Sequence, residues 1–589
     1  ADFFKTGEGP LDERRAVHVA IDIFAEAKWP IHAPLDCKVH WVCYRPDDED
    51  YGHLLILEHQ TDEGVPFWTL YGHLGEETLE LCKMGQTVKA GDQVGTLGRP
   101  DENGNWPPHL HFQLITDLLH FGDEFPGVGL NSQLAVWQSL SPDPSRMLGV
   151  PAGVVAPISR PKEATLAVRK EKIGRNLSIG YKNHLKIVRG WKQYLWDDRA
   201  QKYLDAYNNV PHVGHAHPAV VAAGQRQMEI LNTNTRYLND LLNEYAERLT
   251  ATLPDPLSVC FFVNSASEAN DLAIRLMKAY TGQKDMIVLD AAYHGHTNTL
   301  IDISPYKHDG PGGTGAPDWV HTASIADTYR GLYKADNPQA GIKYAADVQT
   351  QIERIQGMGR GLGGFIAETC PSVGGQIIFP DGYLKAVYQH VKTAGGVTMA
   401  DEVQTGYGRT GSHFYAFEQQ DVIPDMVILG KPIGNGHPIG ALVTTSEIAD
   451  AFNNGMEFFS TFGGNTVSCA TGIAVLDVVQ QENLMAHANQ VGSHLLAGLK
   501  ELVGKYDIVG DARGSGLFLG LELVRDRDTL EPAAAEASFI SNMMREHGIL
   551  MGTDGPYHNV IKIRPPMPFD MSNADFLLET IDKVLKENF

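Results

Sequence analysis

The strongest constraint on the fold is a single break in the pattern of the chain, at residues 141–162. This segment, SPDPSRMLGVPAGVVAPISRPK, is rich in proline and lacks periodic apolar residues, which is typical of a linker. Before it, short alternating stretches such as GHLLILEH, separated by glycine, predict an all-β domain. After it, short apolar strands alternate with helical segments, which predicts a parallel sheet of the α/β class. The expected strands include CFFVN, MIVLD, GGFIAET, GGVTMADEV and DMVILGK.

We therefore expect a multidomain protein. A chain of 589 residues exceeds what one hydrophobic core usually supports. The expected parts are a β-domain at residues 1–140, a linker at 141–165 and an α/β domain at 166–589. The first residue is alanine, which indicates a processed chain or a piece of a longer one.

Charge and cysteine content restrict the function. The chain has 48 Lys and Arg against 72 Asp and Glu, a net charge of −24. Such an acidic chain is poorly suited to nucleic acid or anionic membranes, which attract clustered cations. The six cysteines show no CxxC pattern, which indicates a reducing compartment. With no apolar run as long as a transmembrane helix and no signal-like N-terminus, we expect a cytoplasmic protein that binds neither nucleic acid nor membrane.

Lys431 lies between the apolar VILG and the glycine-rich GNGHPIG. Three interpretations of Lys431 compete: it binds a phosphate group, it is a solvated surface charge, or it holds a carbonyl cofactor covalently. A P-loop lysine follows its glycines and precedes Ser or Thr, whereas proline follows Lys431 and the glycines come later. A strand end would instead deliver Lys431 into a cleft at the edge of the sheet, where desolvation lowers the pKa of the amine and makes it nucleophilic.

Three other segments carry groups that a covalently bound aromatic cofactor with a phosphate group would need. Asp401 closes the strand GGVTMA and would pair with a pyridinium nitrogen, although such an aspartate is more often a turn or cap residue. Ser265, Ala266 and Ser267 open a helix whose N-terminus suits a phosphate group, with a plain helix cap as the alternative. Tyr293 follows a strand and would stack on a flat ring or belong to the core.

From about residue 166 to the end, these segments resemble the class III (ω-)aminotransferases, which are pyridoxal phosphate enzymes of fold type I. The matching motifs are NNVPHVGHAHPAVV, NSASEANDLA, YHGHT, ADEVQTGYGRTG, GKPIGNGHPIGA, STFGGNTVSCA and IKIRPPMPF. The resemblance implies that Lys431 binds the cofactor covalently and that Asp401 pairs with its ring nitrogen. It also implies a large domain at about 216–480, and a small domain formed by the N-terminal segment and about 481–589.

The same resemblance implies further roles. Gln404 would bond the 3-hydroxyl group of the cofactor ring, and His294 would shape the ring environment. Thr461 would reach the cofactor phosphate of a neighbouring subunit, which implies a homodimer. Arg564 would face a substrate carboxylate, and Glu368 would lie beside the substrate pocket.

Within the family, the segments LNTNTRYL and SVGGQIIFPDGYL are similar to ethanolamine-phosphate and 5-phosphohydroxylysine phospho-lyases. This similarity predicts elimination of phosphate and ammonia from a phosphorylated amino alcohol or amino acid. Arg236 and Arg409 are our candidates for binding the substrate phosphate, with structural ion pairs as the alternative. An ω-aminotransferase that uses a keto-acid acceptor, or an ammonia-lyase acting on another amino compound, stays open.

The expected β-domain carries histidines in RRAVHVAID, LYGHL and PPHLHFQL. His and carboxylate side chains are zinc ligands, and a catalytic zinc keeps one position for water. His18 and Asp22 fall on adjacent turn or strand positions. His109 and His111 alternate along one strand, and we expect that they do not both face the same side.

Residues 10–115 resemble the lysostaphin-type (LytM) zinc endopeptidases, a match that includes VKAGDQVGTLG. The resemblance assigns the zinc ligands to His18, Asp22 and His111. It assigns orientation of the water and stabilisation of the tetrahedral intermediate to His73 and His109.

Two positions depart from the peptidase pattern without removing a ligand. Ala20 replaces the usual glycine between the first ligands, and Gln113 replaces the usual glutamate after the HxH motif. A β-domain that packs on the enzyme and binds nothing is the alternative. So is a scaffold whose β-domain binds a cell-wall-like or peptide ligand.

Overall fold

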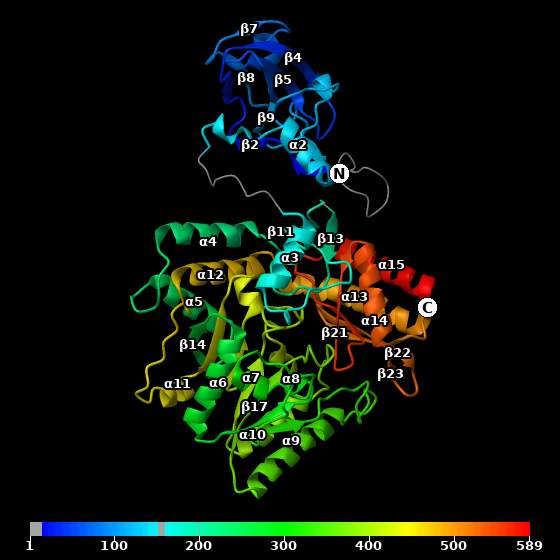
Figure 1. Cartoon of the computed structure of the whole chain (residues 1–589). Helices are drawn as coiled ribbons and strands as arrows, with labels where there is room; N and C mark the ends of the chain where they lie inside the picture. The colour runs from blue at the N-terminus through cyan, green and yellow to red at the C-terminus, as the bar shows by residue number, and fades with distance from the viewer. Residues whose placement is uncertain (1–14, 151–159, 200) are drawn as a thin grey trace. The chain divides into compact units, whose positions relative to one another are not determined.

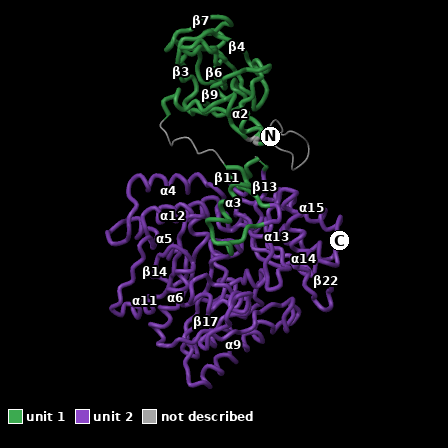
Figure 2. Tube along the Cα trace, viewed as in Figure 1, with its two compact units in different colours: residues 1–180, 184–188, 196–201 green, residues 181–183, 189–195, 202–589 purple. Residues whose placement is uncertain are grey.

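The computed structural model describes residues 15–150, 160–199 and 201–589 (Figure 1). The chain divides into two compact units, shown in different colours in Figure 2. Unit 1 comprises residues 1–180, 184–188 and 196–201, and unit 2 comprises residues 181–183, 189–195 and 202–589. Part of the expected linker, residues 151–159, lies outside the described residues. The boundaries expected from the sequence stay predictions.

Unit 1 contains a six-stranded antiparallel sheet in the order β2-β9-β6-β5-β4-β7. Its strands are β2 (Ile21–Phe24), β4 (Cys37–Arg45), β5 (Gly52–Gln60), β6 (Pro66–Leu74), β7 (Thr87–Val88) and β9 (His109–Ile115). Side chains alternate between the two faces of a strand, so Leu55 and Leu57 enter one hydrophobic cluster while Leu54 and Ile56 enter another. Both faces of the sheet are therefore covered.

Smaller elements complete this β-rich unit. The strand pairs are β1 (Arg15–His18) with β10 (Val128–Leu130), and β3 (Pro30–His32) with β8 (Gln93–Thr96). The helices are α1 (Thr78–Leu81), α2 (Leu134–Leu140) and α3 (Lys162–Lys172). The chain continues through β11 (Ile187–Trp191) and β12 (Tyr194–Asp197). The expected β-domain is confirmed, with α1 and α2 as short additions.

Unit 2 is built around a seven-stranded sheet in the order β14-β20-β19-β18-β17-β15-β16. Its strands are β14 (Leu257–Val263), β15 (Asp285–Leu289), β16 (Val320–Ala323), β17 (Leu362–Glu368), β18 (Val397–Asp401), β19 (Met426–Leu429) and β20 (Gly440–Thr445). Neighbours from β16 to β19 are parallel, as expected from the sequence. The expectation of a parallel sheet is wrong for β20, which runs antiparallel to β14 and to β19. The connection 430–439 is shorter than the dozen or more residues of a parallel crossover, so β20 turns back beside β19.

Helices cover both faces of this sheet. They include α6 (Ala266–Thr281), α9 (Ala340–Gly357) and α10 (Tyr383–Thr393). Val288 and Ile366 of the sheet pack in a cluster with α6, whereas Ile287 and Phe365 pack in a cluster with α9 and α10. Because adjacent strand residues point to opposite faces, an apolar strand buried on both faces reads as a continuous apolar run. This is why MIVLD and GFIA lack alternation.

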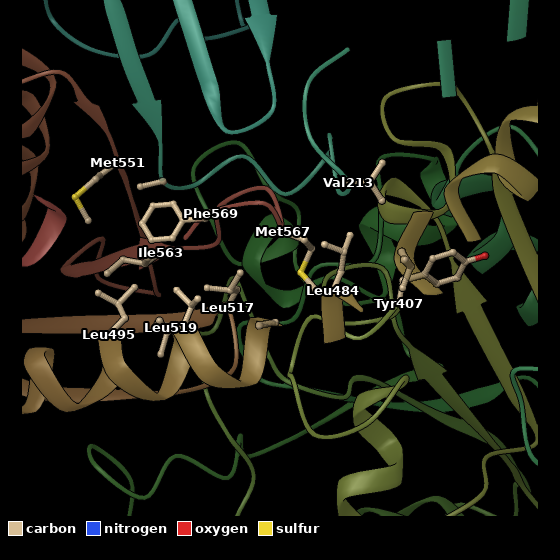
Figure 3. Packing of buried hydrophobic residues seen from close by; sticks show 14 of the residues in the cluster. Val213, Tyr407, Leu484, Leu495, Leu517, Leu519, Met551, Ile563, Met567 and Phe569 are labelled. Atoms are coloured by element: carbon tan, nitrogen blue, oxygen red, sulfur yellow. The ribbon is translucent and has the colours of Figure 1, made fainter. Parts of the chain in front are cut away.

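The C-terminal part of unit 2 forms a second sheet. Its strands are β21 (Val509–Ser515), β22 (Phe518–Asp526), β23 (Glu531–Pro532), β25 (Gly552–Asp554) and β26 (Val560–Ile563), packed with α13 (Leu484–Lys505), α14 (Ala534–Glu546) and α15 (Met571–Asn588). Figure 3 shows Leu495 of α13, Leu519 of β22 and Ile563 of β26 together with Phe569, all fully buried. This apolar cluster joins α13 to the sheet.

The other elements of unit 2 are α4 (Pro218–Ile230), α5 (Asp240–Thr250), α7 (Asn298–Asp302), α8 (Pro305–His308), α11 (Ser446–Phe452), α12 (Thr466–Gln481), β13 (Lys202–Asp205) and β24 (Ile549–Leu550). All six cysteines fall in the described residues, and all carry free thiols. None of the helices within the described residues combines the length and apolarity needed to cross a membrane.

Candidate functional site

Lys431 directly follows Gly430 at the end of β19, and it borders a cavity of about 310 Å³. Its φ is +24°, in a region that residues other than glycine rarely adopt and that usually costs about 1–3 kcal/mol. Many of the side chains expected from the sequence line the same cavity: Ser265, Ala266, Ser267, Tyr293, His294, Glu368, Asp401 and Gln404. The structure therefore brings these predicted cofactor and substrate residues together with the lysine.

The surroundings of Lys431 favour its neutral amine. Burial lowers the pKa of Lys431, and the positive charge of Arg564 lowers it further. Glu368 and Asp401 oppose this shift without cancelling it. A lysine whose pKa is lowered in this way carries a free lone pair more often near neutral pH, which both imine formation and proton abstraction require.

Glu368 and Asp401 lie at the ends of adjacent parallel strands. They are direct partners in the register of β17 and β18, so both carboxyl groups reach the same edge of the sheet. Burial raises the pKa of Glu368, and the neighbouring charge of Asp401 raises it further. The Oε2 atom of Glu368 is buried and has no hydrogen-bond partner among the described residues.

Asp401 is held by three donors. Its Oδ2 lies 2.8 Å from Nδ1 of His294 and accepts from Nδ2 of Asn270 at 3.1 Å, while its Oδ1 accepts from the N–H of Val403 at 3.2 Å. An ionised carboxylate only accepts, so Nδ1 of His294 is the donor. These contacts fix the carboxylate at the cavity. Asn270 is missing from the sequence prediction, although a buried asparagine on the apolar face of SEANDLAIRL is a detectable signal.

The N-terminus of α6 forms another wall of the cavity. Ser265 caps the helix and accepts from the N–H of Glu268 at 3.2 Å. The first turn of a helix leaves N–H groups without intrahelical acceptors, which suits an anion. Glycines let the neighbouring segments approach this turn. A Cβ on Gly295, whose φ is +144°, would lie 2.6 Å from Oγ of Ser267, and a Cβ on Gly440 would lie 2.3 Å from the carbonyl oxygen of Ser265.

These features fit pyridoxal phosphate. The cavity volume is at the lower end of the usual range for small-molecule sites, about 300–1,000 Å³. Asp401 provides the anionic partner that the ring nitrogen needs, and Lys431 provides the amine. The α6 N-terminus would hold the cofactor phosphate, and Tyr293 is a half-buried aromatic beside it.

Arg564 and Gln404 are linked to each other. Nη1 of Arg564 donates to Oε1 of Gln404 at 2.8 Å and to Oγ of Ser372 at 2.5 Å. Oε1 of Gln404 also accepts from Nδ2 of Asn209 at 2.6 Å. Nη2 of Arg564 lies 3.7 Å from Asp554. Gln404 lines the cavity, and the guanidinium of Arg564 is already engaged by Gln404, Ser372 and Asp554.

The structure does not bring Arg409, Arg236 or Thr461 to this cavity. Arg409 is fully buried and donates to the carbonyl oxygens of Leu517 and Pro565 at 3.1 and 2.8 Å. Those contacts favour a structural role for Arg409 over phosphate binding, although carbonyl oxygens provide them in place of the expected ion pair. Arg236 is exposed, and its Nη1 lies 3.3 Å from Glu457. Thr461 is also exposed, in the segment that follows Glu457.

In unit 1, the expected zinc ligands form a compact cluster. His18, Asp22 and His111 offer ligand atoms that all lie within 4.8 Å of one another. Nδ1 of His111 lies 3.2 Å from Nε2 of His18 and 3.4 Å from Oδ1 of Asp22. The strand register explains this contact, because Asp22 of β2 pairs directly with His111 of β9. Two imidazole nitrogens and one carboxylate oxygen are a ligand set that fits zinc.

His73 and His109 lie beside this cluster. Both line a cavity of about 850 Å³ together with the three expected ligands. The two rings are 4.4 Å apart, and Nε2 of His109 lies 3.9 Å from Oδ1 of Asp22. The expectation that His109 and His111 do not share a side is wrong. Positions i and i+2 of a strand point to the same face, so both histidines face the cavity.

Gln113 supports His111. Its Oε1 lies 3.3 Å from Nε2 of His111, and its Nε2 donates to Oγ of Ser141 at 2.8 Å. A partner on the second ring nitrogen fixes the tautomer of a metal-binding histidine. Gln113 therefore still orients His111, although the peptidase pattern usually has glutamate at this position.

A strand-end lysine that shares a cavity with a held aspartate is the arrangement of α/β enzymes that use pyridoxal phosphate. Residues 178–585 match the family model "Aminotransferase class-III", and the chain belongs to this family of pyridoxal phosphate-dependent enzymes. Residues 16–121 match "Peptidase family M23". Both family resemblances seen in the sequence are confirmed.

Three similar proteins illustrate the relationship. The chain is 48% identical over 436 residues to "Alanine--glyoxylate aminotransferase 2-like" of Drosophila melanogaster, which covers 72% of this chain and 88% of the relative. It is 42% identical over 448 residues to "Ethanolamine-phosphate phospho-lyase homolog 1" of Caenorhabditis elegans, covering 74% and 96%. A solved structure of a phospholyase from Arthrobacter in complex with phosphoethanolamine is 40% identical, with a TM-score of 0.69 and coverage of 72% and 99%.

Proposed function

We propose that the α/β part is a phospho-lyase that eliminates phosphate and ammonia from a phosphorylated primary amine, with ethanolamine phosphate as the first candidate. The observation that carries this proposal is the 40% identity to the Arthrobacter phospholyase, across 99% of that chain. The contacts of Arg564 also support a phospho-lyase. A transaminase needs a group for its keto-acid carboxylate, and this guanidinium is occupied by Ser372 and Gln404 and faces Asp554.

The side chains at the cavity suit this elimination. When bound, pyridoxal phosphate supplies an electron sink for negative charge at the carbon next to the substrate nitrogen. Lys431, with its lowered pKa, would remove the proton from that carbon. Asp401, oriented by His294 and Asn270, would be the carboxylate partner of the ring nitrogen. Loss of phosphate from the next carbon, followed by hydrolysis, yields an aldehyde and ammonia without a keto acid.

The first prediction concerns the products. Purified holoenzyme given ethanolamine phosphate and no keto acid should release inorganic phosphate and ammonia in equal amounts, because elimination consumes no amino acceptor. Both products can be measured in the same reaction. Phosphoserine and phosphorylated hydroxylysine should be tested alongside. Turnover that requires pyruvate or glyoxylate, with no phosphate released, would instead support the ω-aminotransferase that the 48% identical relative suggests.

We also propose a homodimer in which Thr461 reaches the cofactor phosphate of the other subunit. Thr461 lies in an exposed segment rich in apolar side chains. This segment lies against the chain near residue 236, because the guanidinium of Arg236 is 4.3 Å from the ring centre of Phe459. The exposed apolar residues of the two segments are Ile230, Leu231, Tyr237, Leu238, Met456, Phe459 and Phe462. An apolar patch of this kind marks an interaction surface.

The second prediction concerns mass in solution. Light scattering on the purified chain should give twice the chain mass of 64.6 kDa, because two copies would cover the apolar patch. Replacing Leu238 by Glu should shift the mass toward that of one chain, since a buried unpaired charge opposes association. A monomeric mass for the unmodified chain would contradict the proposal.

For the β-domain we propose one zinc site formed by His18, Asp22 and His111. The observation behind it is that ligand atoms of the three side chains lie within 4.8 Å of one another. Zinc at such a site would polarise a peptide carbonyl and a water molecule. His109 and His73 line the same cavity, where they would orient water and donate to a developing oxyanion. Peptide hydrolysis is therefore the second candidate function, with peptide binding alone as its alternative.

The third prediction concerns metal content. The purified chain should contain one zinc ion by elemental analysis, and His18→Ala should lose it because two ligands hold zinc poorly. His32→Ala is the matched control, since His32 is an exposed histidine of the same domain whose Nδ1 contacts the carbonyl of Gly91. Equal zinc content in His18→Ala and His32→Ala would contradict the site. Cleavage of cell-wall peptides should decrease in the variants in proportion to the loss of zinc.

A further inference from the structure

A phospho-lyase must hold a substrate dianion close to Lys431, and the two arginines expected to do so lie elsewhere. Arg409 is bound to main-chain carbonyls inside the core, and Arg236 lies outside the cavity beside Glu457. The protein as a whole is strongly acidic, with a net charge of −24. A local cation is therefore needed for a phosphate group to enter and stay.

Two cations at the end of β26, Lys562 and Arg564, are already paired. Arg564 donates to neutral oxygens and lies 3.7 Å from Asp554. Lys562 lies 3.3 Å from the same carboxylate of Asp554. These two cations thus share one carboxylate at partly or fully buried positions. Their charge is largely committed to Asp554.

Lys307 differs from these residues. Its side chain is exposed, and its Nζ lies 5.7 Å from the ring centre of Tyr293 and 5.0 Å from that of Tyr306. Tyr293 lines the cavity that contains Lys431. Among the described residues no carboxylate forms an ion pair with Lys307, and the adjacent Asp309 contacts His308 at 3.0 Å instead. Lys307 is thus an uncommitted cation next to the cavity wall.

The backbone holds Lys307 in this place. The N–H of Lys307 donates to the carbonyl of Ser304 at 2.7 Å, and the N–H of Tyr306 donates to that of Ala292 at 3.2 Å. Oγ of Ser304 accepts from the N–H of His294 at 3.0 Å. The segment with Lys307 is therefore tied to the residues on both sides of Tyr293. A cation over two aromatic rings is also restrained by their negative faces.

We propose that the ammonium of Lys307 binds the phosphate group of the substrate and selects phosphorylated amines over uncharged ones. The inference rests on the proposed phospho-lyase function. A lysine binds phosphate as a point charge through charge-assisted hydrogen bonds. With the amine of the substrate directed to Lys431, a phosphate on the next carbon that extends along Tyr293 would come within reach of Lys307, whose Nζ lies 5.7 Å from that ring centre.

The test compares Lys307→Met, Lys307→Arg and Lys343→Met in the holoenzyme. Lys343 is the matched control, because it is an exposed lysine 5.3 Å from the ring centre of Tyr333 in another part of unit 2. Loss of one charged hydrogen bond to phosphate should raise the KM for ethanolamine phosphate by roughly ten- to a hundredfold in Lys307→Met. Its kcat should change far less than its KM. Lys307→Arg keeps the charge and should restore most of the affinity.

Calorimetric titration with inorganic phosphate provides a readout that does not depend on turnover. Phosphate should bind Lys307→Met more weakly than Lys343→Met by a similar factor. Equal KM values and equal phosphate affinities for these two variants would overturn the assignment of Lys307. A wild-type enzyme that releases no phosphate from any phosphorylated amine would overturn the proposed function instead, and the titration would still decide whether Lys307 binds phosphate.

Discussion

The desolvated amine of Lys431 is the constraint on which the chemistry of unit 2 depends. Burial and the charge of Arg564 lower its pKa, and the strand ends around it determine what it meets. In a parallel sheet the carboxyl ends of neighbouring strands share one edge, so β17, β18 and β19 deliver Glu368, Asp401 and Lys431 to the same place. The N-terminus of α6 closes that place with N–H groups suited to an anion. One sheet edge thus brings together an amine, an acid and an anion site.

Sheet geometry also organises the candidate zinc site, but through cross-strand pairing and not through parallel strand ends. In unit 1 the sheet is antiparallel, and the pairing of Asp22 with His111 brings two ligands of the cluster into contact. His18, at the end of β1, completes the set, and Gln113 orients His111 from the opposite ring nitrogen. Two kinds of sheet therefore concentrate titratable groups, one by parallel strand ends and the other by cross-strand register.

The sequence predicts much of the fold and of the two sites. The continuous apolar runs predicted the buried strands β15, β17, β18 and β19, and the small-residue turn before SEANDLAIRL predicted α6. The sequence indicates Asp401 because it ends such a strand, and Lys431 because it follows one after a single glycine. Antiparallel β20 was missed, because apolar content does not reveal strand direction. The residues that would bind the substrate phosphate are the hardest to predict. The sequence alone does not distinguish the exposed cation of Lys307 from the buried cation of Arg409.

The covalent role of Lys431 is tested most directly by borohydride reduction of the holoenzyme, followed by proteolysis and mass spectrometry of the peptides. Reduction converts an imine between the cofactor and a lysine into a stable amine, which marks the lysine that held the cofactor. We predict a pyridoxyl group on the peptide that contains Lys431, and no label after Lys431→Ala. An unlabelled Lys431 in an enzyme that still contains the cofactor, or a label on a different lysine, would contradict the account.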